Sequence, residues 1–301
     1  MSGVVAVVQA RSGSSRLPNK VLADMGGMPM LAFQLHRLRP LGVPVVVATS
    51  DLPGDDDVAA VASAAGAEVV RGSEADVLSR FVLALDTHPA EVVVRLTGDC
   101  PLTDPAIVAA VVDTHRSTGA DYTSNVLPRS YPKGLDVEVI APAALREADR
   151  LATAGPDREH VTPYLYRHPE RYRLANHRSG RDLGEEWWTV DTAIDLDRVR
   201  GLVDRLGEPI AATWLDVLAV AGRQVVPTPG EVWLAPGHNP VPGSTPWRRE
   251  WDASVDGVAV GTVAVDVEQA EGRREIAVDE TYRAAAVAAL DRLLAGDQQL
   301  R

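Results

Sequence analysis

The chain has 301 residues, a formal net charge of −12 and a hydrophobic content of 46%, which is enough for one large core or for one core with a small appended module. The acidic balance argues against nucleic acids and membranes as partners, because both are bound through basic surfaces. Cys100 is the one cysteine and no apolar stretch approaches about 20 residues, so we expect a cytoplasmic protein without disulfides or a membrane-spanning segment.

The first 200 residues alternate apolar strand patterns with helical patterns. We predict strands at Val4–Val8, Val43–Ala48, Ala67–Val70 and Glu91–Leu96, and helices at Met28–Leu38, from Asp55 to about Gly66, after an N-cap at Ser73, and from Asp104 to about Thr118. Because the strands are uniformly apolar and each is followed by a helix, this pattern predicts an α/β fold. We expect a Rossmann-like, doubly wound, mostly parallel sheet that binds its ligands at the carboxyl ends of the strands.

Shorter elements follow Gly119. We predict strands at Tyr122–Asn125, Val137–Ile140, Arg171–His177 and Trp187–Val190, and helices at Ala141–Ala154, Arg158–Arg167, Ile194–Leu206 and Pro209–Ala221. We expect residues 1–222 to form one domain, residues 223–250 to be a Pro-rich connector, and residues 251–301 to form a small α+β module. In this module we predict a hairpin at Ser254–Val267 that turns at Gly257, then a strand end and a helix within Ala277–Leu294.

A cationic loop follows the first strand. Arg11, Arg16 and Lys20 lie within ten residues of one another, among small residues that let backbone N–H groups approach a ligand. Three cations this close repel one another unless an anion joins them, and both guanidinium and ammonium groups suit phosphate oxygens. The loop therefore predicts a polyphosphate site, with an ordinary solvated turn as the alternative. Lys20 is also one of only two lysines in the chain; the other is Lys133.

Two aspartates each follow a predicted strand. Asp99 comes after the strand at Glu91–Leu96, and Asp191 comes after the strand at Trp187–Val190. Carboxylates at one sheet edge can converge on a Mg²⁺ ion that bridges phosphate oxygens, whereas a lone aspartate at either place would be explained as a helix cap. Their occurrence together with the cationic loop favours the metal site.

Other polar segments are each compatible with two roles, one functional and one structural. Arg71–Asp76 either caps a helix or presents polar groups to a nucleotide base. In the Gly134–Val139 segment, Asp136 and Glu138 share a face and either bind hydroxyls or a second metal, or are solvated. His160, at the predicted start of a helix, is either a catalytic base or a hydrogen-bonding partner. Cys100 is expected to be a buried structural thiol.

Taken together, these motifs resemble those of the cytidylyltransferases. The matching segments are Gln9–Arg11, Ser15–Pro18 with Lys20, Arg95–Leu102, Tyr131–Val139, Arg158–Tyr164 and Trp188–Thr192. They span about residues 3–205 and resemble most the SpsF-like branch, which is named for spore-coat polysaccharide biosynthesis and is related to the CMP-sialic acid and CMP-Kdo synthetases. The resemblance implies a fold of the nucleotide-diphospho-sugar transferase type. It also implies Mg²⁺-dependent transfer of CMP from CTP, or of another nucleotide from its triphosphate, to a sugar acid, sugar phosphate or phosphonate, with release of pyrophosphate.

The resemblance also implies roles for individual residues. The nucleotide would be held by Gln9, Ala10, Arg11, Ser12, Gly13, Arg16 and Lys20, with Arg71, Ser73 and Asp76 near its base and ribose, and of these Arg11, Arg16 and Lys20 would be catalytic. Asp99 and Asp191 would bind Mg²⁺. The acceptor, an anionic sugar-like compound or a phosphonate, would be faced by Asn125, Asp136, Glu138, Glu159 and His160. We add Arg129 and Lys133 to the acceptor-binding residues because they lie in the same loop-and-strand region, although the resemblance demands no particular residue at position 133. The family's usual glycine is replaced by Asn19, which tolerates positive φ, so the turn is expected to survive.

Two other functions are compatible with the sequence. SpsF-like proteins are often labelled glycosyltransferases, which would use a finished sugar nucleotide, and a non-catalytic nucleotide-binding scaffold subunit is the other alternative. The resemblance does not cover residues 223–301. Their last part is faintly similar to half of a GNAT acetyltransferase, but Arg283–Ala286 stands where a glycine-rich pyrophosphate loop is needed. We therefore expect an interaction or oligomerisation element there, with a homodimer as the simplest assembly.

Overall fold

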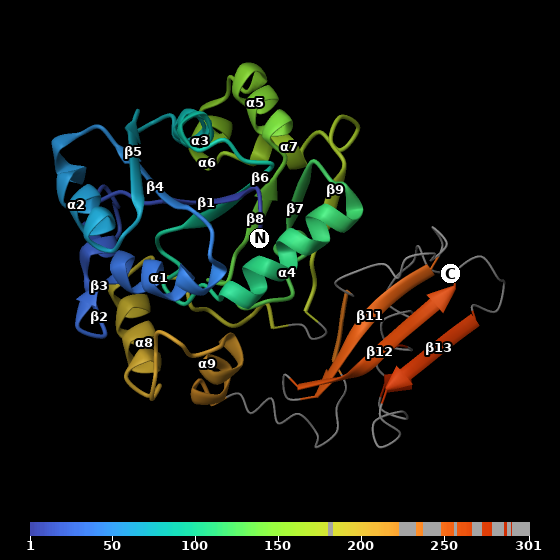
Figure 1. Ribbon diagram of the computed structural model, residues 1–301. Coiled ribbons are helices and arrows are strands. Elements are labelled where there is room, and N and C mark those ends of the chain that lie inside the picture. The colour runs from blue at the N-terminus through green and yellow to red at the C-terminus, as the bar shows by residue number, and fades with distance from the viewer. Residues whose placement is uncertain are drawn as a thin grey trace. The chain divides into compact units, whose positions relative to one another are not determined.

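The computed structural model (Figure 1) describes residues 1–179, 183–222, 233–236, 248–255, 258–266, 273–278, 286–287 and 290. The chain divides into two units, Met1–Arg223 and Gln224–Arg301.

A seven-stranded sheet with the order β5-β4-β1-β6-β8-β7-β9 forms the centre of the first unit. The strands are β1 (Val4–Gln9), β4 (Val45–Ser50), β5 (Glu68–Gly72), β6 (Val92–Thr97), β7 (Tyr122–Ser124), β8 (Glu138–Ile140) and β9 (Leu174–Asn176). The first four strands in this order pair in parallel, as do β7 and β9, while β8 runs antiparallel to both of its neighbours. The predicted mostly parallel, doubly wound α/β architecture is confirmed.

Helices cover both faces of this sheet, as Figure 1 shows for α3, α5, α6 and α7 above it and α1 and α4 below it. The helices are α1 (Met30–Leu38), α2 (Asp56–Ala64), α3 (Val77–Thr87), α4 (Pro105–Thr118), α5 (Pro142–Leu151), α6 (Gly155–His160), α7 (Pro163–Tyr166), α8 (Ala193–Val203) and α9 (Trp214–Val220). Single 3₁₀ turns occur at η1 (Lys20–Leu22), η2 (Arg39–Leu41) and η3 (Pro53–Asp55). The valines of β1, β4 and β6 are almost all fully buried between these layers, which explains the apolar strand pattern.

Several boundaries differ from the prediction near the N-terminal half of the sheet. Met28 does not begin α1, because it pairs with Met25 in a two-stranded hairpin of β2 (Asp24–Met25) and β3 (Met28–Pro29). The cap of α3 is Asp76, which accepts a hydrogen bond from Ser79 N at 3.0 Å, and not Ser73, whose hydroxyl accepts from the amide of Asp76 in the turn before it.

Three predicted elements of the later half are also wrong. The helix at Arg158–Arg167 is interrupted at Val161, whose φ of 71° lies outside the helical region, and this leaves two short helices, α6 and α7. Trp187–Val190 forms no strand and makes only an isolated bridge between Lys133 and Trp187. The last helix begins at Trp214, behind a capping box at Thr213, rather than at Pro209.

The second unit contains a four-stranded antiparallel sheet in the order β10-β11-β12-β13. Its strands are β10 (Trp233–Pro236), β11 (Arg248–Val255), β12 (Val258–Asp266) and β13 (Arg273–Val278). The predicted hairpin corresponds to β11 and β12, although β10 and the start of β11 lie within the segment predicted as connector. The turn at Gly257 and most of the predicted final helix lie outside the described residues; residues 286, 287 and 290 are helical.

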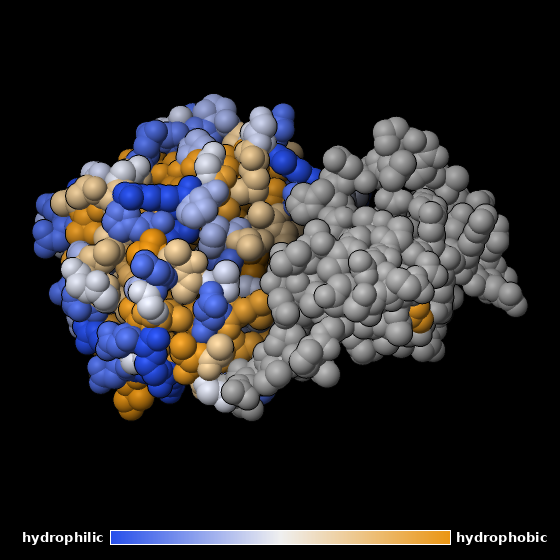
Figure 2. All heavy atoms as spheres, turned by 60° about the horizontal axis from the view of Figure 1, so that its bottom comes forward, coloured by the Kyte–Doolittle hydropathy of each residue, from blue (hydrophilic) through white to orange (hydrophobic). Residues whose placement is uncertain are grey.

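Figure 2 views the first unit from the side of α8 and α9, where hydrophobic residues gather in patches between hydrophilic ones. Two large hydrophobic side chains on these helices are exposed, Ile194 by 73% and Leu215 by 41%. Within the described part of the chain, no helix combines the length and the apolar character needed to cross a membrane.

Candidate active site

The cationic loop after β1 is anchored by a buried carboxylate. Asp55 is 3% exposed, and its Oδ1 accepts hydrogen bonds from both the amide and the hydroxyl of Ser12 at 2.6 Å. Its Oδ2 accepts from the amide and hydroxyl of Ser50 at the end of β4. Burial would raise the pKa of Asp55, but these four hydrogen bonds outweigh it and the pKa is lowered. Sequence reasoning placed Asp55 at a helix start and missed this contact.

Asp55→Asn is expected to destabilise the protein by about 1–3 kcal/mol at pH 7, because an amide cannot accept all four hydrogen bonds. Since the pKa of Asp55 is lowered on folding, its contribution is complete above the unfolded-state pKa of about 4 and is lost as the pH falls through the folded-state value. Urea unfolding at pH 7 and at pH 3 measures both effects. A difference between the wild type and the variant that stays the same at pH 3 would contradict this role for the ionised carboxylate.

The loop then turns Lys20 toward the sheet. Asn19 has a φ of 58°, the positive φ that we expected asparagine to tolerate at this turn, and η1 begins at the next residue. The end of β1 also packs closely on the end of β6, since a Cβ on Gly98 would lie 3.0 Å from the Cβ of Ala10. At this place Gln9 accepts a hydrogen bond from Arg95 Nε at 3.1 Å.

Lys20, Asp99 and Asp191 meet at the carboxyl end of β6. The ammonium of Lys20 lies 3.1 Å from Asp99 Oδ2, 3.1 Å from Asp191 Oδ1 and 2.8 Å from the carbonyl oxygen of Val190. Arg16 adds a second cation, 2.9 Å from Asp191 Oδ1. Burial opposes ionisation of Asp99, but the charge of Lys20 and several hydrogen bonds prevail, so the pKa of Asp99 is lowered. The two predicted metal ligands, Asp99 and Asp191, therefore lie in contact with two predicted phosphate ligands, Lys20 and Arg16.

Asp191 reaches this place without a strand. The amide of Val190 donates to the carbonyl of Asp99 at 2.8 Å, and the amide of Asp191 donates to Asp195 at 3.3 Å. Asp195 also closes a capping box with Thr192 at the start of α8. The carboxylate is thus positioned by a loop held between β6 and a helix N-terminus.

The pair Asp99 and Asp191 fits a hard divalent cation. Oxygen donors of this kind suit Mg²⁺, which commonly takes one or two carboxylates together with substrate phosphates and water. No cluster of three or more potential His, Cys, Asp or Glu ligands occurs among the described residues. Any Mg²⁺ held here by these two carboxylates would complete its coordination with water or with oxygens of the substrate.

Arg11, Arg71 and Asp76, three further predicted nucleotide ligands, are held in place by ion pairs. Arg11 lies 3.7 Å from Glu74 and 3.4 Å from Glu159, and a Cβ on Gly13 would lie 3.1 Å from Glu74. Arg71 donates to the carbonyl oxygens of Ser50 and Leu52 at 2.9 Å and pairs with Asp56 at 2.7 Å. Asp76 pairs with Arg158 through two of its guanidinium nitrogens.

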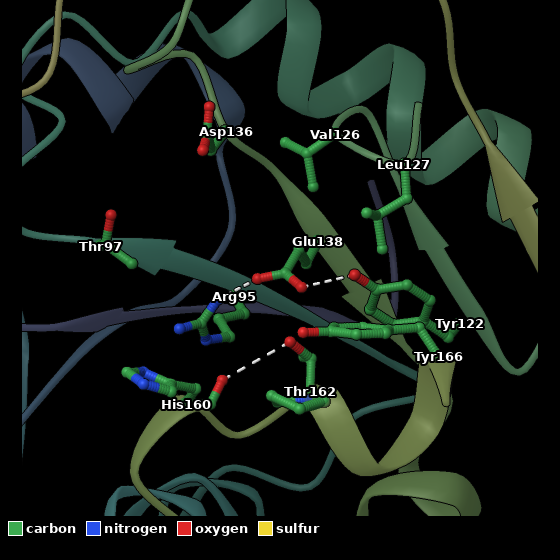
Figure 3. Close-up of a pocket in the computed structure, with 11 residues that line it drawn as sticks. Arg95, Thr97, Tyr122, Val126, Leu127, Asp136, Glu138, His160, Thr162 and Tyr166 are labelled. Atoms are coloured by element: carbon green, nitrogen blue, oxygen red, sulfur yellow. Dashed lines mark hydrogen bonds and ion pairs between the residues drawn. The ribbon is translucent and has the colours of Figure 1, made fainter. Parts of the chain in front are cut away.

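A cavity of about 220 Å³ opens at the carboxyl end of β6, where Thr97 belongs to its lining (Figure 3). Its lining comes from β6, β7, β8 and the segment around α6 and α7, and comprises Arg95, Thr97, Tyr122, Val126, Leu127, Asp136, Glu138, His160, Thr162, Pro163 and Tyr166. In Figure 3, Glu138 accepts a hydrogen bond from Tyr122 OH at 2.5 Å with one oxygen and pairs with Arg95 through the other. Arg95 and Tyr122 were missed by sequence reasoning, although a single arginine in the apolar run of β6 was a usable signal.

Comparison with known proteins identifies the family. A family model described as cytidylyltransferase matches residues 5–199. The spore coat polysaccharide biosynthesis protein SpsF of Bacillus subtilis is 34% identical over 217 residues, which cover 69% of this chain and 89% of that protein. The chain belongs to the cytidylyltransferase family. It is thus an enzyme of the nucleotidyltransferase class, as the motifs predicted.

Other relatives agree with this membership. The structure of a cytidylyltransferase from Leptospira borgpetersenii matches with a TM-score of 0.69 and 29% identity, covering 74% of this chain and 95% of that one. The 3-deoxy-manno-octulosonate cytidylyltransferase of Tolumonas auensis is 38% identical over 125 residues, which cover 38% of this chain and 46% of that enzyme. A structure of CMP:2-keto-3-deoxy-manno-octonic acid synthetase complexed with CTP shares the fold, with a TM-score of 0.52 and 22% identity over 68% of this chain and 99% of that one.

In this cytidylyltransferase, only part of the predicted acceptor set lines the cavity. Asp136, Glu138 and His160 do so, with His160 at the end of α6 rather than at a helix start. Asp136 and Glu138 are not simply solvated, because Arg129 binds Asp136 with both terminal nitrogens, at 2.6 and 2.8 Å, and Arg95 pairs with Glu138.

The other predicted acceptor residues lie outside the cavity lining. Asn125 is fully buried, and its amide bonds the backbone of Leu135 and Val137 at 2.7 and 2.9 Å, so its role is structural. Lys133 stacks its ammonium 3.5 Å from the ring centre of Trp187. Glu159 faces Arg11.

Cys100 follows Asp99 but is a buried thiol. It is 3% exposed, and burial raises its pKa well above the ordinary value. A thiol of this kind is neutral at physiological pH and is a poor nucleophile.

Proposed function

We propose that this cytidylyltransferase transfers CMP from CTP to an acceptor oxygen and releases pyrophosphate. The acceptor oxygen attacks the α-phosphorus in line, the bond from this phosphorus to the bridging oxygen of the β-phosphate breaks, and the acceptor proton passes to solvent. The observation that carries the proposal is the convergence of Lys20, Arg16, Asp99 and Asp191 at one strand end, next to a cavity of substrate size. Such a site acts through positioning and charge neutralisation.

The cations of the loop would leave their present partners for the triphosphate. Among the residues that the structure describes, Arg11, Arg16 and Lys20 contact carboxylates and a carbonyl oxygen, and phosphate oxygens offer the same kind of acceptor with more charge. Asp99 and Asp191 would hold Mg²⁺, which when bound neutralises charge on the phosphates. Asp55 keeps the loop in place during this exchange.

We propose that the acceptor occupies the cavity of Figure 3 and is a sugar acid, a sugar phosphate or a phosphonate. The carboxylates of Asp136 and Glu138 are suited to accept hydrogen bonds from sugar hydroxyls. Arg95 and Arg129, the cations beside these carboxylates, are already paired with Glu138 and Asp136. We therefore expect an anionic group of the acceptor to point toward the cationic loop and His160.

Pyrophosphate release from CTP with Mg²⁺ and an acceptor panel tests the function. CTP is expected to support release and to raise the melting temperature more than GTP, UTP or ATP does. Release of a nucleoside diphosphate from a finished sugar nucleotide, without pyrophosphate formation from any triphosphate, would establish the glycosyltransferase alternative. Mg²⁺-dependent CTP binding without turnover over the whole panel would establish the scaffold alternative.

We further propose that the second unit mediates self-association in a homodimer and does not contribute to catalysis. The metal ligands, the cationic loop and the cavity all lie within residues 1–222, and the family model ends at residue 199. Truncation after Gly222 is therefore expected to leave pyrophosphate release within about threefold of the full chain while converting a dimer into a monomer. Light scattering coupled to size exclusion measures the number of chains per particle. A truncated chain that is still a dimer would contradict the role in self-association.

A further inference from the structure

Arg80 on α3 is a buried arginine with two guanidinium nitrogens that find no acceptor in the described part of the chain. Its side chain is 2% exposed, and neither Nε nor Nη1 has a hydrogen-bond acceptor among the described residues. Arg37 is buried to a similar degree, but its guanidinium donates to five backbone carbonyl oxygens. A buried charge is costly unless it is paired, so the unsatisfied Nε and Nη1 of Arg80 indicate an acceptor that arrives with a ligand.

The surroundings of Arg80 place it at the nucleotide edge of the sheet. Its stem passes the end of β5, since a Cβ on Gly72 would lie 3.2 Å from Arg80 Cγ. Burial first, and then the charge of Arg11, lower the pKa of Arg80, while Asp55, Glu74 and Asp76 act in the opposite direction. These four residues belong to the loops that follow β1, β4 and β5. The guanidinium therefore lies among three loops at the carboxyl ends of the strands.

The order of the strands indicates which part of a nucleotide comes near Arg80. Along the sheet the order is β5-β4-β1-β6-β8, with Asp99 after β6 and the acceptor cavity beside β6 and β8. A nucleotide whose α-phosphate lies near Asp99 and faces the cavity must extend the other way, across the loop after β1 and toward β4 and β5. Its base and ribose then approach the loops around Arg80, while its phosphates meet Arg11, Arg16 and Lys20.

We propose that Arg80 selects the base, by donating two parallel N–H groups to O2 and N3 of cytosine. This assignment rests on the proposed use of CTP. Cytosine presents two adjacent acceptors at this edge, whereas uracil presents a donor at N3, which would leave one N–H of a buried guanidinium facing another donor. A site built around such a buried donor pair rejects a base that cannot complete it.

Arg80→Met and Arg80→Lys test the assignment through kcat/KM for CTP and UTP. The wild type is expected to favour CTP by about 10²-fold or more, and Arg80→Met is expected to lose about 10²-fold with CTP but less than about threefold with UTP. Arg80→Lys keeps the charge without the planar fork and is expected to lose most of the preference as well. Arg146→Met, at an exposed ion pair with Asp86, serves as the matched control and leaves the preference unchanged.

A modified substrate gives a test that does not depend on folding of a variant. In 3-deazacytidine triphosphate a C–H group replaces N3, so the wild type is expected to use it at least about tenfold less well than CTP, and Arg80→Met to use the two alike. Equal use of both by the wild type would overturn the assignment. Equal losses with CTP and UTP in Arg80→Met would also overturn it, since Arg80 would then bind a phosphate. A wild type that uses no triphosphate at all would overturn the proposed function itself.

Discussion

Asp99→Asn is expected to lower pyrophosphate release by about 10²-fold or more at saturating CTP and Mg²⁺. The amide keeps the shape of the side chain but removes one of two charges that meet Lys20 and that would hold the metal. Because one charged ligand is lost, the Mg²⁺ concentration needed for half-maximal rate is also expected to rise. A coupled pyrophosphate assay over a range of Mg²⁺ concentrations measures both quantities.

Asp86→Asn is the matched control for this experiment. Asp86 carries the same charge, but it is half exposed and pairs with Arg146 at the surface. Its substitution is expected to leave the rate within about twofold of the wild type, as exposed ion pairs contribute little. Near-normal turnover by Asp99→Asn would refute the assignment of this residue as a metal ligand.

Lys20→Met is expected to cause a second loss of about 10²-fold or more in kcat, with the site otherwise intact. The side chain is 12% exposed and its ammonium makes three contacts within 3.1 Å, so its removal takes this cation from Asp99 and leaves Asp191 paired with Arg16. Lys20→Arg is not expected to restore activity, because the larger planar guanidinium cannot take the place of a compact ammonium.

Single-turnover kinetics separate the two contributions of Lys20. If it acts on the developing charge of the leaving pyrophosphate, the chemical step slows more than CTP binding weakens. A variant with normal kcat and only a raised KM would assign Lys20 to uniform substrate binding. Thermal unfolding of both Lys20 variants shows whether the fold is retained.

The sheet could be predicted because its signal is local. The valine-rich runs that form β1, β4 and β6 are buried on both faces, and each is followed by a helix with its own apolar stripe. Lys20, in the loop after β1, and Asp99, at the end of β6, come together for the same reason, since parallel strands bring their carboxyl ends to one edge. Asp191 is brought to them by a loop and not by a strand.

What the sequence could not predict depends on contacts between distant residues. Trp187–Val190 is apolar enough for a strand, but it forms a loop. In this loop Trp188 is buried, and its backbone amide donates a hydrogen bond to the carbonyl oxygen of Lys133. Val161 has positive φ although β-branched residues disfavour it, so only the surrounding structure accounts for the end of α6 there. The partners Ser12 and Asp55 are 43 residues apart, a distance over which spacing carries no information.

The contact of Lys20 with both carboxylates has a consequence for the order in which substrates load. The ammonium already balances Asp99 and Asp191, so a metal ion arriving alone must compete with a tethered charge of the same sign. A triphosphate gives that ammonium a new partner and at the same time frees the carboxylates. We therefore expect positive cooperativity between metal and nucleotide, equal in both directions as thermodynamic linkage requires. We expect these ion pairs of Lys20 to weaken metal binding to the free enzyme until the nucleotide has bound.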